Sequence, residues 1–329
     1  MAVADTFSVL NYSGVLYAKS DNNTRLLDAI LTRGRTTNVA RTGVRKVAST
    51  EFDLYSSYDI PAGSQPAISE TASLTATVGA VTTRSQETNV VQIFQEAVEV
   101  SYLKQASTGS LAGLNIAGQN NNVANETDFQ IQAKLLKMKK DLNYTLINGV
   151  YQKATSAATA AKTKGLIAGI TDNAEEYANA GFDKTSLNTA ISAAMANGFA
   201  FNDGRIELWV NPADLLTITN VYGYNESTFA QPASRDTAGV AIRNIMTDFG
   251  MLGVDYDKDI PSGTMLLLDM SQLAIAEMDY INPDGINYGC WFYEDLAKKG
   301  ASNAAQIFGI AGIDYGAQIK HIKLTKAGE

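Results

Sequence analysis

The chain has 329 residues and a mass of 35.2 kDa, with 45% hydrophobic and 18% charged residues. This is the composition of a folded globular protein, and it excludes disordered, collagen-like and coiled-coil chains. Lys and Arg number 26 against 34 Asp and Glu, so the net charge is −8. We therefore do not expect the whole molecule to bind nucleic acid or an anionic membrane, and any such contact must be local.

The sequence contains no signal peptide and no stretch of about 18 apolar residues, so it predicts a chain that is soluble and cytoplasmic at synthesis and has no membrane partner. Cys290 is the only cysteine. A single cysteine excludes an internal disulfide and a multi-cysteine zinc site, and it favours a reducing compartment. We interpret Cys290 as a small buried residue.

Charge is distributed unevenly along the N-terminal third of the chain. Residues 1–48 carry seven basic and three acidic residues, whereas residues 49–100 carry seven acidic residues and one basic residue. Because opposite charges attract, we expect the two segments to contact each other within one molecule or between neighbouring molecules. The candidate contact residues are Arg33, Arg35, Arg41, Arg45, Glu51, Asp53, Asp59, Glu70, Arg84 and Glu87. Packaged DNA is the alternative partner for the four N-terminal arginines, which would neutralise its phosphates.

Residues 52–100 alternate short apolar runs with Thr, Ser and turn residues, which predicts β-strands that include residues 73–78 and 89–94. A turn-forming sequence at residues 59–66 interrupts them. This segment has too few apolar residues for a core of its own. We predict a long hairpin that projects from the body and is covered by another surface; the alternative is an ordinary surface hairpin.

An uncharged Gly, Asn and Ala connector occupies residues 105–125, and a long helix follows it. The helix is predicted over residues 126–149, about 35 Å, because apolar residues recur at spacings of three and four. These apolar residues are Ile131, Leu135, Met138, Leu142 and Leu146. We expect them to form a packing face rather than a cofactor groove.

Helices and strands alternate after residue 164, which predicts a compact α/β subdomain. The predicted helices cover residues 183–196, 211–222 and 239–249, and the predicted strands cover residues 205–210, 252–256, 265–268 and 273–278. Three further strands are predicted at residues 291–294, 303–313 and 316–324, the last two joined by a short turn around Asp314 and Tyr315.

Residues for catalysis are scarce, so we predict no enzyme activity, no cofactor and no metal site. The only histidine, His321, lies in an apparent strand and is interpreted as structural. Residues 255–259 resemble the start of a calcium-binding loop, but Ile260 replaces the required glycine. Neither a phosphate-binding loop nor a dinucleotide-binding, nucleophile-elbow or zinc-hydrolase motif occurs.

The order of these parts resembles the major capsid proteins of tailed double-stranded DNA bacteriophages, which have the HK97-type capsid fold. The resemblance covers nearly the whole chain. It is carried by residues 85–101, 129–149, 165–170, 210–214, 247–250 and 296–300.

The resemblance implies an α+β fold with an N-terminal arm, an extended hairpin called the E-loop, a P-domain with a long spine helix, and an α/β A-domain. The implied domains are the arm at 1–48, the E-loop at 49–100, the first P-domain part at 101–163 with its spine helix at 126–149, the A-domain at 164–285 and the second P-domain part at 286–329.

By the same resemblance, the chain is expected to assemble in the host cytoplasm into hexamers and pentamers of an icosahedral virion capsid around double-stranded DNA. Implied partners are other copies of the chain, a portal, and separate scaffolding or decoration proteins. Two alternatives stay open. One is the shell protein of a cargo-loaded nanocompartment, and the other is a soluble α/β enzyme or binding module centred on residues 165–285.

Overall fold

The computed structural model describes residues 16–17, 23–36, 42–58, 63–76, 79, 81–106, 126–178, 181–201, 205–222, 244–297 and 300–328. The helices are α2 (Arg25–Arg33), α3 (Glu70–Ser73), α4 (Tyr102–Ala106), α5 (Glu126–Asn148), α6 (Leu166–Gly169), α7 (Lys184–Ala196), α8 (Pro212–Tyr222), η1 (Met270–Gln272) and η2 (Gln318–Lys320). No described helix has the length and hydropathy needed to cross a membrane.

The strands are β1 (Val44–Lys46), β2 (Glu51–Tyr58), β3 (Arg84–Val90), β4 (Gln92–Ser101), β5 (Ala174–Tyr177), β6 (Ile206–Val210), β7 (Asn244–Thr247), β8 (Gly250–Tyr256), β9 (Thr264–Asp269), β10 (Ala274–Glu277), β11 (Tyr280–Ile281), β12 (Asn287–Gly289), β13 (Trp291–Asp295), β14 (Ser302–Asp314) and β15 (Ile322–Lys326). The described strands form a five-stranded sheet, a six-stranded sheet, and the two-stranded pairs β2–β3 and β11–β12.

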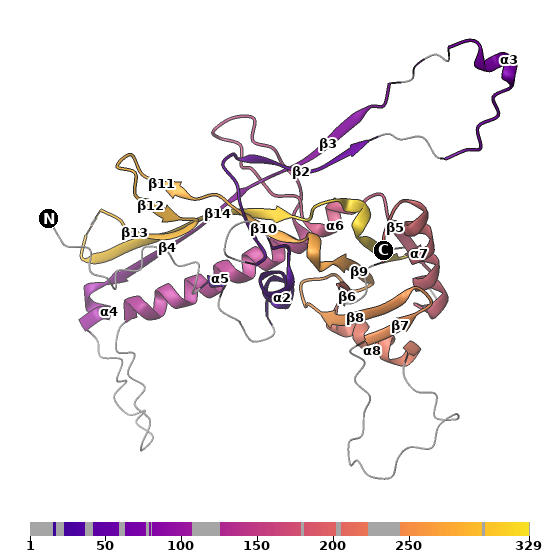
Figure 1. Cartoon of the computed structure of the whole chain (residues 1–329). Helices are drawn as coiled ribbons and strands as arrows, with labels where there is room; N and C mark the ends of the chain where they lie inside the picture. Colours follow the sequence, from indigo (N-terminus) through magenta and orange to yellow (C-terminus); the bar gives the residue numbers. More distant parts are fainter. Residues whose placement is uncertain are drawn as a thin grey trace, which may run out of the picture.

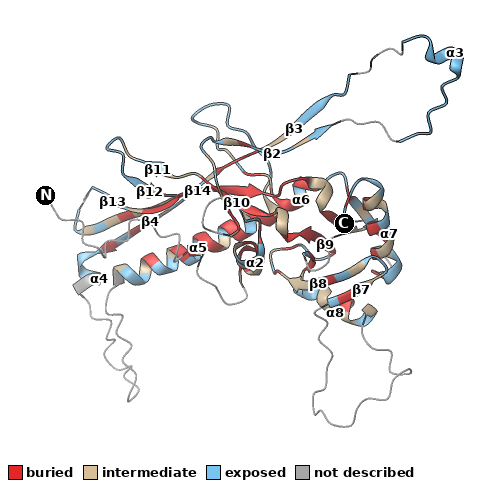
Figure 2. Ribbon diagram, viewed as in Figure 1, coloured by how far each residue is buried: buried red, intermediate tan, exposed pale blue. Residues whose placement is uncertain are grey.

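Strand β14 is the centre of the five-stranded sheet (Figure 1). Strand β4 pairs along one edge of β14, and β13 and β10 share the other edge. The long helix α5 packs against β4 and β14. The five apolar residues predicted for its packing face are all buried, which confirms that prediction and places the first core between helix and sheet (Figure 2).

Close packing against a tryptophan ring explains the glycine at position 309 of β14. The ring of Trp291 on β13 covers Gly309, where an added Cβ would lie 2.0 Å from the ring atom Cε3. Only glycine leaves room for this ring, so the glycine at position 309 is a packing requirement.

The six-stranded sheet has the order β5-β15-β9-β6-β8-β7 and encloses a second core. Its central strands β6 and β9 are buried along their whole length, as their mainly apolar sequences require; the polar exceptions are Glu207 in β6 and Thr264 and Asp269 at the ends of β9. Helix α7 contributes Leu187, Ala190, Ile191 and Ala194 to this core, at helical spacing. The predicted helices at 183–196 and 211–222 and the strand at 205–210 are confirmed within one residue at each end.

Three local predictions are wrong. Residues 70–73 form the short helix α3, and residues 74–76 are not part of a strand; residues 77 and 78 of that prediction lie outside the described residues. Residues 244–247 form strand β7 instead of helix, because they pair with β8; the rest of that prediction, 239–243, lies outside the described residues. Residues 318–320 form the 3-10 helix η2, and the last strand begins at Ile322 and pairs with β9 and β5 in the six-stranded sheet.

Candidate functional site

The hairpin of β2 and β3 leaves the body of the molecule, as predicted (Figures 1 and 2). Its strands pair antiparallel from Glu51 opposite Val90 to Tyr58 opposite Arg84. Burial is confined to the base of the hairpin, and all residues from 63 to 76 are exposed. The described residues of the outer half, 63–76, 79 and 81–83, therefore form no core with the rest of the described chain.

Large apolar side chains nevertheless occur on this outer half. Ile68, Leu74 and Val81 are 60%, 84% and 90% exposed. The helix α3 shapes the tip, and its N-cap residue Ser69 accepts a hydrogen bond from the backbone N–H of Ala72 at 3.1 Å. Large apolar side chains exposed on a projecting hairpin indicate a surface that another molecule covers.

Three cations of the same chain neutralise the acidic base of the hairpin. Nζ of Lys153 lies 2.5 Å from Glu51, and Nζ of Lys164 lies 3.1 Å from Glu87. The contact with Lys153 and the hydrogen bond from Thr88 lower the pKa of Glu51. Arg45 Nη2 lies 2.7 Å from Asp53, so the predicted attraction between arm and hairpin occurs at this pair within one molecule.

The predicted arm arginines also have acidic partners within the chain. Asp314 is fully buried at the end of β14, and it accepts hydrogen bonds from Arg45 at 2.8 Å and Arg35 at 3.3 Å. Arg33 contacts Glu207 on β6. Contacts of these arginines with a neighbouring subunit or with DNA stay predictions.

Of the remaining candidate residues, Arg41 and Asp59 lie outside the described residues. Glu70 lies on α3 at the tip, and Arg84 lies at the start of β3; both are exposed. In the described ranges neither has an oppositely charged partner. These two charges are therefore available for contacts outside the subunit.

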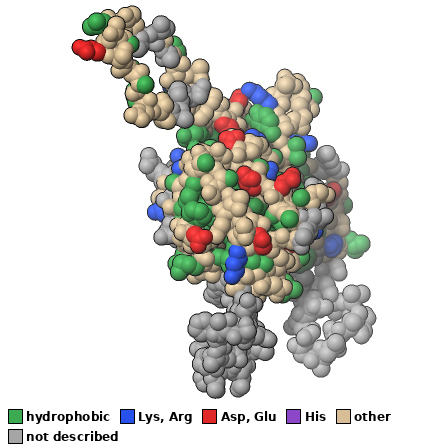
Figure 3. Space-filling model, turned by 90° about the vertical axis from the view of Figure 1, so that its right-hand side faces the viewer, with side chains coloured by type: hydrophobic (Ala, Val, Ile, Leu, Met, Phe, Trp, Pro, Cys, Tyr) green, Lys and Arg blue, Asp and Glu red, His purple; other side chains and the backbone are tan. Residues whose placement is uncertain are grey.

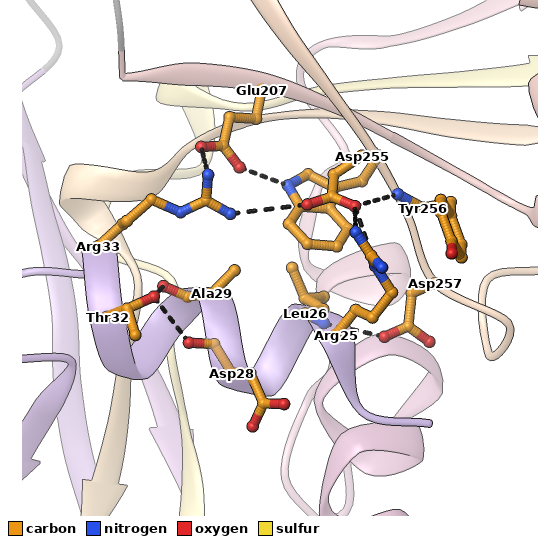
Figure 4. A network of polar contacts seen from close by, with 11 residues as sticks. Arg25, Leu26, Asp28, Ala29, Thr32, Arg33, Glu207, Asp255, Tyr256 and Asp257 are labelled. Carbon is orange, nitrogen blue, oxygen red and sulfur yellow. Dashed lines mark hydrogen bonds and ion pairs between the residues drawn. The ribbon is translucent and has the colours of Figure 1, made fainter. Parts of the chain in front are cut away.

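Helix α2 carries an arginine near each end that contacts the six-stranded sheet (Figure 4). Arg25 Nη2 lies 2.5 Å from Asp255 on β8, and the Arg25 guanidinium lies 4.1 Å from the ring centroid of Tyr256. Arg33, at the other end of the helix, lies 2.7 Å from Glu207 and 3.7 Å from Asp255. The helix is thereby fixed to the six-stranded sheet at both ends.

The first turn of α2 is capped by residues distant in sequence. The backbone N–H of Leu26 donates to Asp257 at 2.9 Å, and that of Leu27 donates to Asn143 of α5 at 3.1 Å. Asn143 in turn donates to Asp257 and Asp259. The acidic run at 255–259 is thus a structural anchor, and burial raises the pKa of Asp257.

The sequence analysis did not predict α2, although a signal was present. Leu26, Leu27 and Ile30 recur at helical spacing, and all three are fully buried. Tyr17 is fixed in a similar way, because its hydroxyl donates to Glu277 and accepts from the indole N–H of Trp291 at 2.8 Å. Part of the arm is therefore built into the core.

His321 and Cys290 have structural environments. The imidazole of His321 is buried; Nδ1 accepts from the backbone N–H of Asp269 at 3.2 Å, and Nε2 donates to the Tyr315 carbonyl at 2.7 Å. Burial lowers its pKa, so the ring is neutral. Burial raises the pKa of the Cys290 thiol, because the charged form of a thiol is the thiolate, and the thiol donates a hydrogen bond to the Ile310 carbonyl. Both side chains stabilise the fold.

An open groove of 690 Å³ lies beside α7. It is lined by Lys184, Thr185, Asn188, Thr189, Ser192, Ala193, Ala196 and Phe249. This lining offers one titratable group and no pair of groups for acid–base chemistry. On the face of the molecule in Figure 3, charged side chains are scattered among polar and apolar ones, and the hairpin rises above them.

A family model described as SU10 major capsid protein matches residues 2–328. The chain belongs to this family. It is the major capsid protein of a phage, a structural protein of the virion capsid, as the resemblance implied. Comparison with curated protein sequences gives no significant match.

Solved structures agree with this assignment at the level of the fold. The capsid protein of cyanophage A-1(L) is similar with a TM-score of 0.65 at 11% identity, over 93% of both chains. The capsid protein of a native GTA particle gives 0.53 at 16% identity, over 94% of this chain and 93% of that one. A chain from the structure of Mycobacterium phage Bobi gives 0.50 at 14% identity, over 97% of this chain and 95% of that one. The predicted HK97-type fold is confirmed.

Proposed function

We propose that this major capsid protein assembles into hexamers and pentamers of an icosahedral shell around double-stranded DNA, and that the β2–β3 hairpin of each subunit packs on a neighbouring subunit. The exposed apolar tip of the hairpin carries this proposal. We also propose the domain boundaries given above, with the hairpin as the E-loop. Portal and separate scaffolding or decoration proteins are the proposed further partners.

The energetics of shell assembly support a role for such a tip. Closed shells need contacts that are individually weak, so that misplaced subunits can leave, and numerous, so that the complete shell is stable. Burying three exposed aliphatic side chains contributes about 1.5 to 3 kcal/mol each at most. A tip that adds nothing to the subunit core can supply this contact without a cost to folding.

The distribution of charge also supports a contact between the outer part of the hairpin and a neighbouring subunit. The acids at the hairpin base have partners in their own subunit, whereas Glu70 and Arg84 on the outer part have none in the described ranges. We therefore propose that Glu70 and Arg84, of the ten candidate residues, contact a neighbouring subunit. Their unit charges would set the orientation of the tip more than its affinity.

A variant with Ile68→Ser, Leu74→Ser and Val81→Ser tests the proposal. We expect subunits with unchanged thermal stability, because the replaced side chains are exposed, and a loss of closed shells in negative-stain electron microscopy and sedimentation. The matched control is Ile281→Ser, which changes a side chain that is 59% exposed on β11, away from the hairpin. Normal shells from the triple variant would refute a role of the tip in assembly.

A further inference from the structure

The β2–β3 hairpin is joined to the body of the subunit by side chains rather than by a shared sheet. Among the described strands, β2 and β3 pair only with each other. Strand β3 ends at Val90, and the chain continues after Val91 as β4 of the five-stranded sheet (Figure 1). At the base, Phe52 and Leu54 pack into the first core. The direction of the hairpin relative to the body therefore depends on side-chain contacts at its base.

The junction between β3 and β4 passes β14 at a close contact. An added Cβ at Gly312 of β14 would lie 2.9 Å from the carbonyl oxygen of Val90 and 3.3 Å from Cα of Val91. It would also lie 3.1 Å from Oγ1 of Thr163, which accepts a hydrogen bond from the backbone N–H of Ile313 at 3.3 Å. Glycine lets the two backbones approach, so the hairpin leaves the body at a fixed point.

Asn89 lies at this point and is the one fully buried polar side chain of β2 and β3. Its Oδ1 accepts hydrogen bonds from the backbone N–H groups of Lys164 at 2.8 Å and Val90 at 2.9 Å. Its Nδ2 donates to the backbone carbonyls of Lys164 at 3.1 Å and Ile313 at 2.9 Å. The amide thus pairs with the backbone of Lys164 as a neighbouring strand would, and every polar group at this buried point has a partner.

A second contact lies two residues away on the same side of β3. Glu87 accepts a hydrogen bond from the hydroxyl of Tyr315 at 2.8 Å, and it lies 3.1 Å from Nζ of Lys164. Tyr315 is fully buried. Asn89 and Glu87 therefore attach the hairpin to the same two parts of the body, Lys164 and the end of β14 with the residue after it.

We propose that Asn89 is a positioning residue for assembly, which sets, together with Glu87, the direction in which the hairpin leaves the subunit. The inference deepens the proposed function, on which it rests. A tip that already points in one direction loses less conformational freedom when it meets a neighbouring subunit. The ion pairs of Lys153 and Asp53 at the base contribute less to this direction, because these side chains are 56% and 57% exposed.

The distance between two spin labels tests the proposal on the unassembled full chain. One label is attached at Ser85→Cys on the exposed part of β3, and the other at Gln132→Cys, an exposed position of α5. Cys290 is buried, so we expect it not to react with the label. Double electron–electron resonance then gives the distribution of distances between the labels. A hairpin of fixed direction predicts a single narrow distribution for the chain with Asn89 and Glu87 intact.

Variants of the labelled chain assign this direction to the two residues. Asn89→Ala and Glu87→Ala should each make the distribution roughly twofold broader, because further directions of the hairpin become populated. Asn89→Ala also removes hydrogen bonds from buried backbone groups and should lower the thermal midpoint. Glu87→Ala changes a side chain that is 23% exposed, and it decides alone if Asn89→Ala does not fold. The matched control is Thr88→Val, since the Thr88 hydroxyl donates to Glu51 within the hairpin at 2.9 Å, and its distribution should stay unchanged.

Shells of the same variants connect the direction of the hairpin to assembly. Glu87→Ala should give particles of mixed diameter or incomplete shells in electron microscopy and sedimentation, whereas Thr88→Val should assemble like the unaltered chain. Uniform shells of unchanged diameter from a variant with a broadened distribution would overturn the role in assembly.

A distribution that is equally narrow in the unaltered chain and in the folded Asn89 and Glu87 variants would overturn the proposal. So would a broad distribution in the unaltered chain, or equal broadening in Thr88→Val, which would mean that the hairpin loosens within itself. The distance measurement needs no shells. A failure of the unaltered chain to assemble would therefore refute the proposed function, whereas normal shells with unchanged distributions in the variants would refute this inference alone.

Discussion

Nη1 of Arg33 lies 2.7 Å from Oε1 of Glu207, and this ion pair joins the end of the arm helix α2 to a central strand of the six-stranded sheet. The side chain of Glu207 is 9% exposed, whereas that of Arg33 is 48% exposed. Burial therefore acts on the carboxylate more than on its partner. The pKa of Glu207 is raised, first by its burial and further by nearby Asp255, despite the attraction of Arg33.

The raised pKa of Glu207 predicts a pH-dependent stability of defined sign. The folded chain holds this proton more tightly than the unfolded chain, in which a glutamate has a pKa of about 4.3. Its contribution to the free energy of unfolding therefore increases as pH falls from neutral through the raised pKa. In urea unfolding, Glu207→Gln should gain stability relative to the unaltered chain as pH rises from about 4.5 to 7.

Glu51→Gln is the matched control for this titration, because the pKa of Glu51 is lowered. Its contribution is present above the unfolded pKa and is lost as pH falls through the folded pKa. Relative to the unaltered chain, Glu51→Gln should therefore lose stability as pH rises, which is the opposite of the change expected for Glu207→Gln. A Glu207→Gln variant that loses stability relative to the unaltered chain as pH rises would contradict the account.

Of the two arginines that contact Asp314, Arg45 should contribute more than Arg35 to the free energy of unfolding. It bridges Asp314 and Asp53. Its removal leaves the fully buried Asp314 carboxylate with the longer contact to Arg35 and the hydrogen bond from the backbone N–H of Gly316. We expect Arg45→Ala to cost about 1 to 3 kcal/mol in urea unfolding. Arg35→Ala, at a side chain 42% exposed, should cost below about 1 kcal/mol. Equal costs would argue against this ranking.

Gly309 should not tolerate a methyl group. Gly309→Ala would place Cβ against the Trp291 ring, which has no room to move in the core, and we expect a loss of about 1 to 3 kcal/mol. Gly300→Ala is the control, since an added Cβ there meets no atom within 4 Å. Thermal unfolding of both variants checks this, and an unchanged midpoint for Gly309→Ala would refute the close contact.

The two sides of α5 should respond differently to truncation. Leu142 is fully buried, and Leu142→Ala should cost about 2 to 5 kcal/mol through lost burial and a cavity. Tyr144→Ala, two residues away on the exposed side of the helix, should alter stability by about 0.5 kcal/mol or less. Similar losses at both positions would mean that the Tyr144 side chain is packed within the subunit.

Predictions from sequence succeeded where a local pattern determines the structure. The 23-residue helix α5 was predicted from its own spacing of apolar residues, and the exposed hairpin was predicted from its lack of them. Strand β7 was missed because its pairing with β8 decides its conformation, although the residues permit a helix.

The anchors of the arm could not be predicted because they depend on distant residues. The first turn of α2 is capped by Asp257 and Asn143, which are 231 and 116 residues away from their partners. The apolar residues of α2 also mean that deleting the whole arm would remove part of the core. Point variants are therefore the cleaner test of its assembly role.

Negative-stain electron microscopy with sedimentation of the full chain, expressed alone and with its neighbouring genes, tests the central claim most directly. The account predicts uniform polyhedral shells, or tubes and free hexamers where a partner is missing, with DNA inside shells from the natural source. Protein cargo without nucleic acid would indicate a nanocompartment. A monomer or dimer under every assembly condition would contradict the role of this chain as a shell protein.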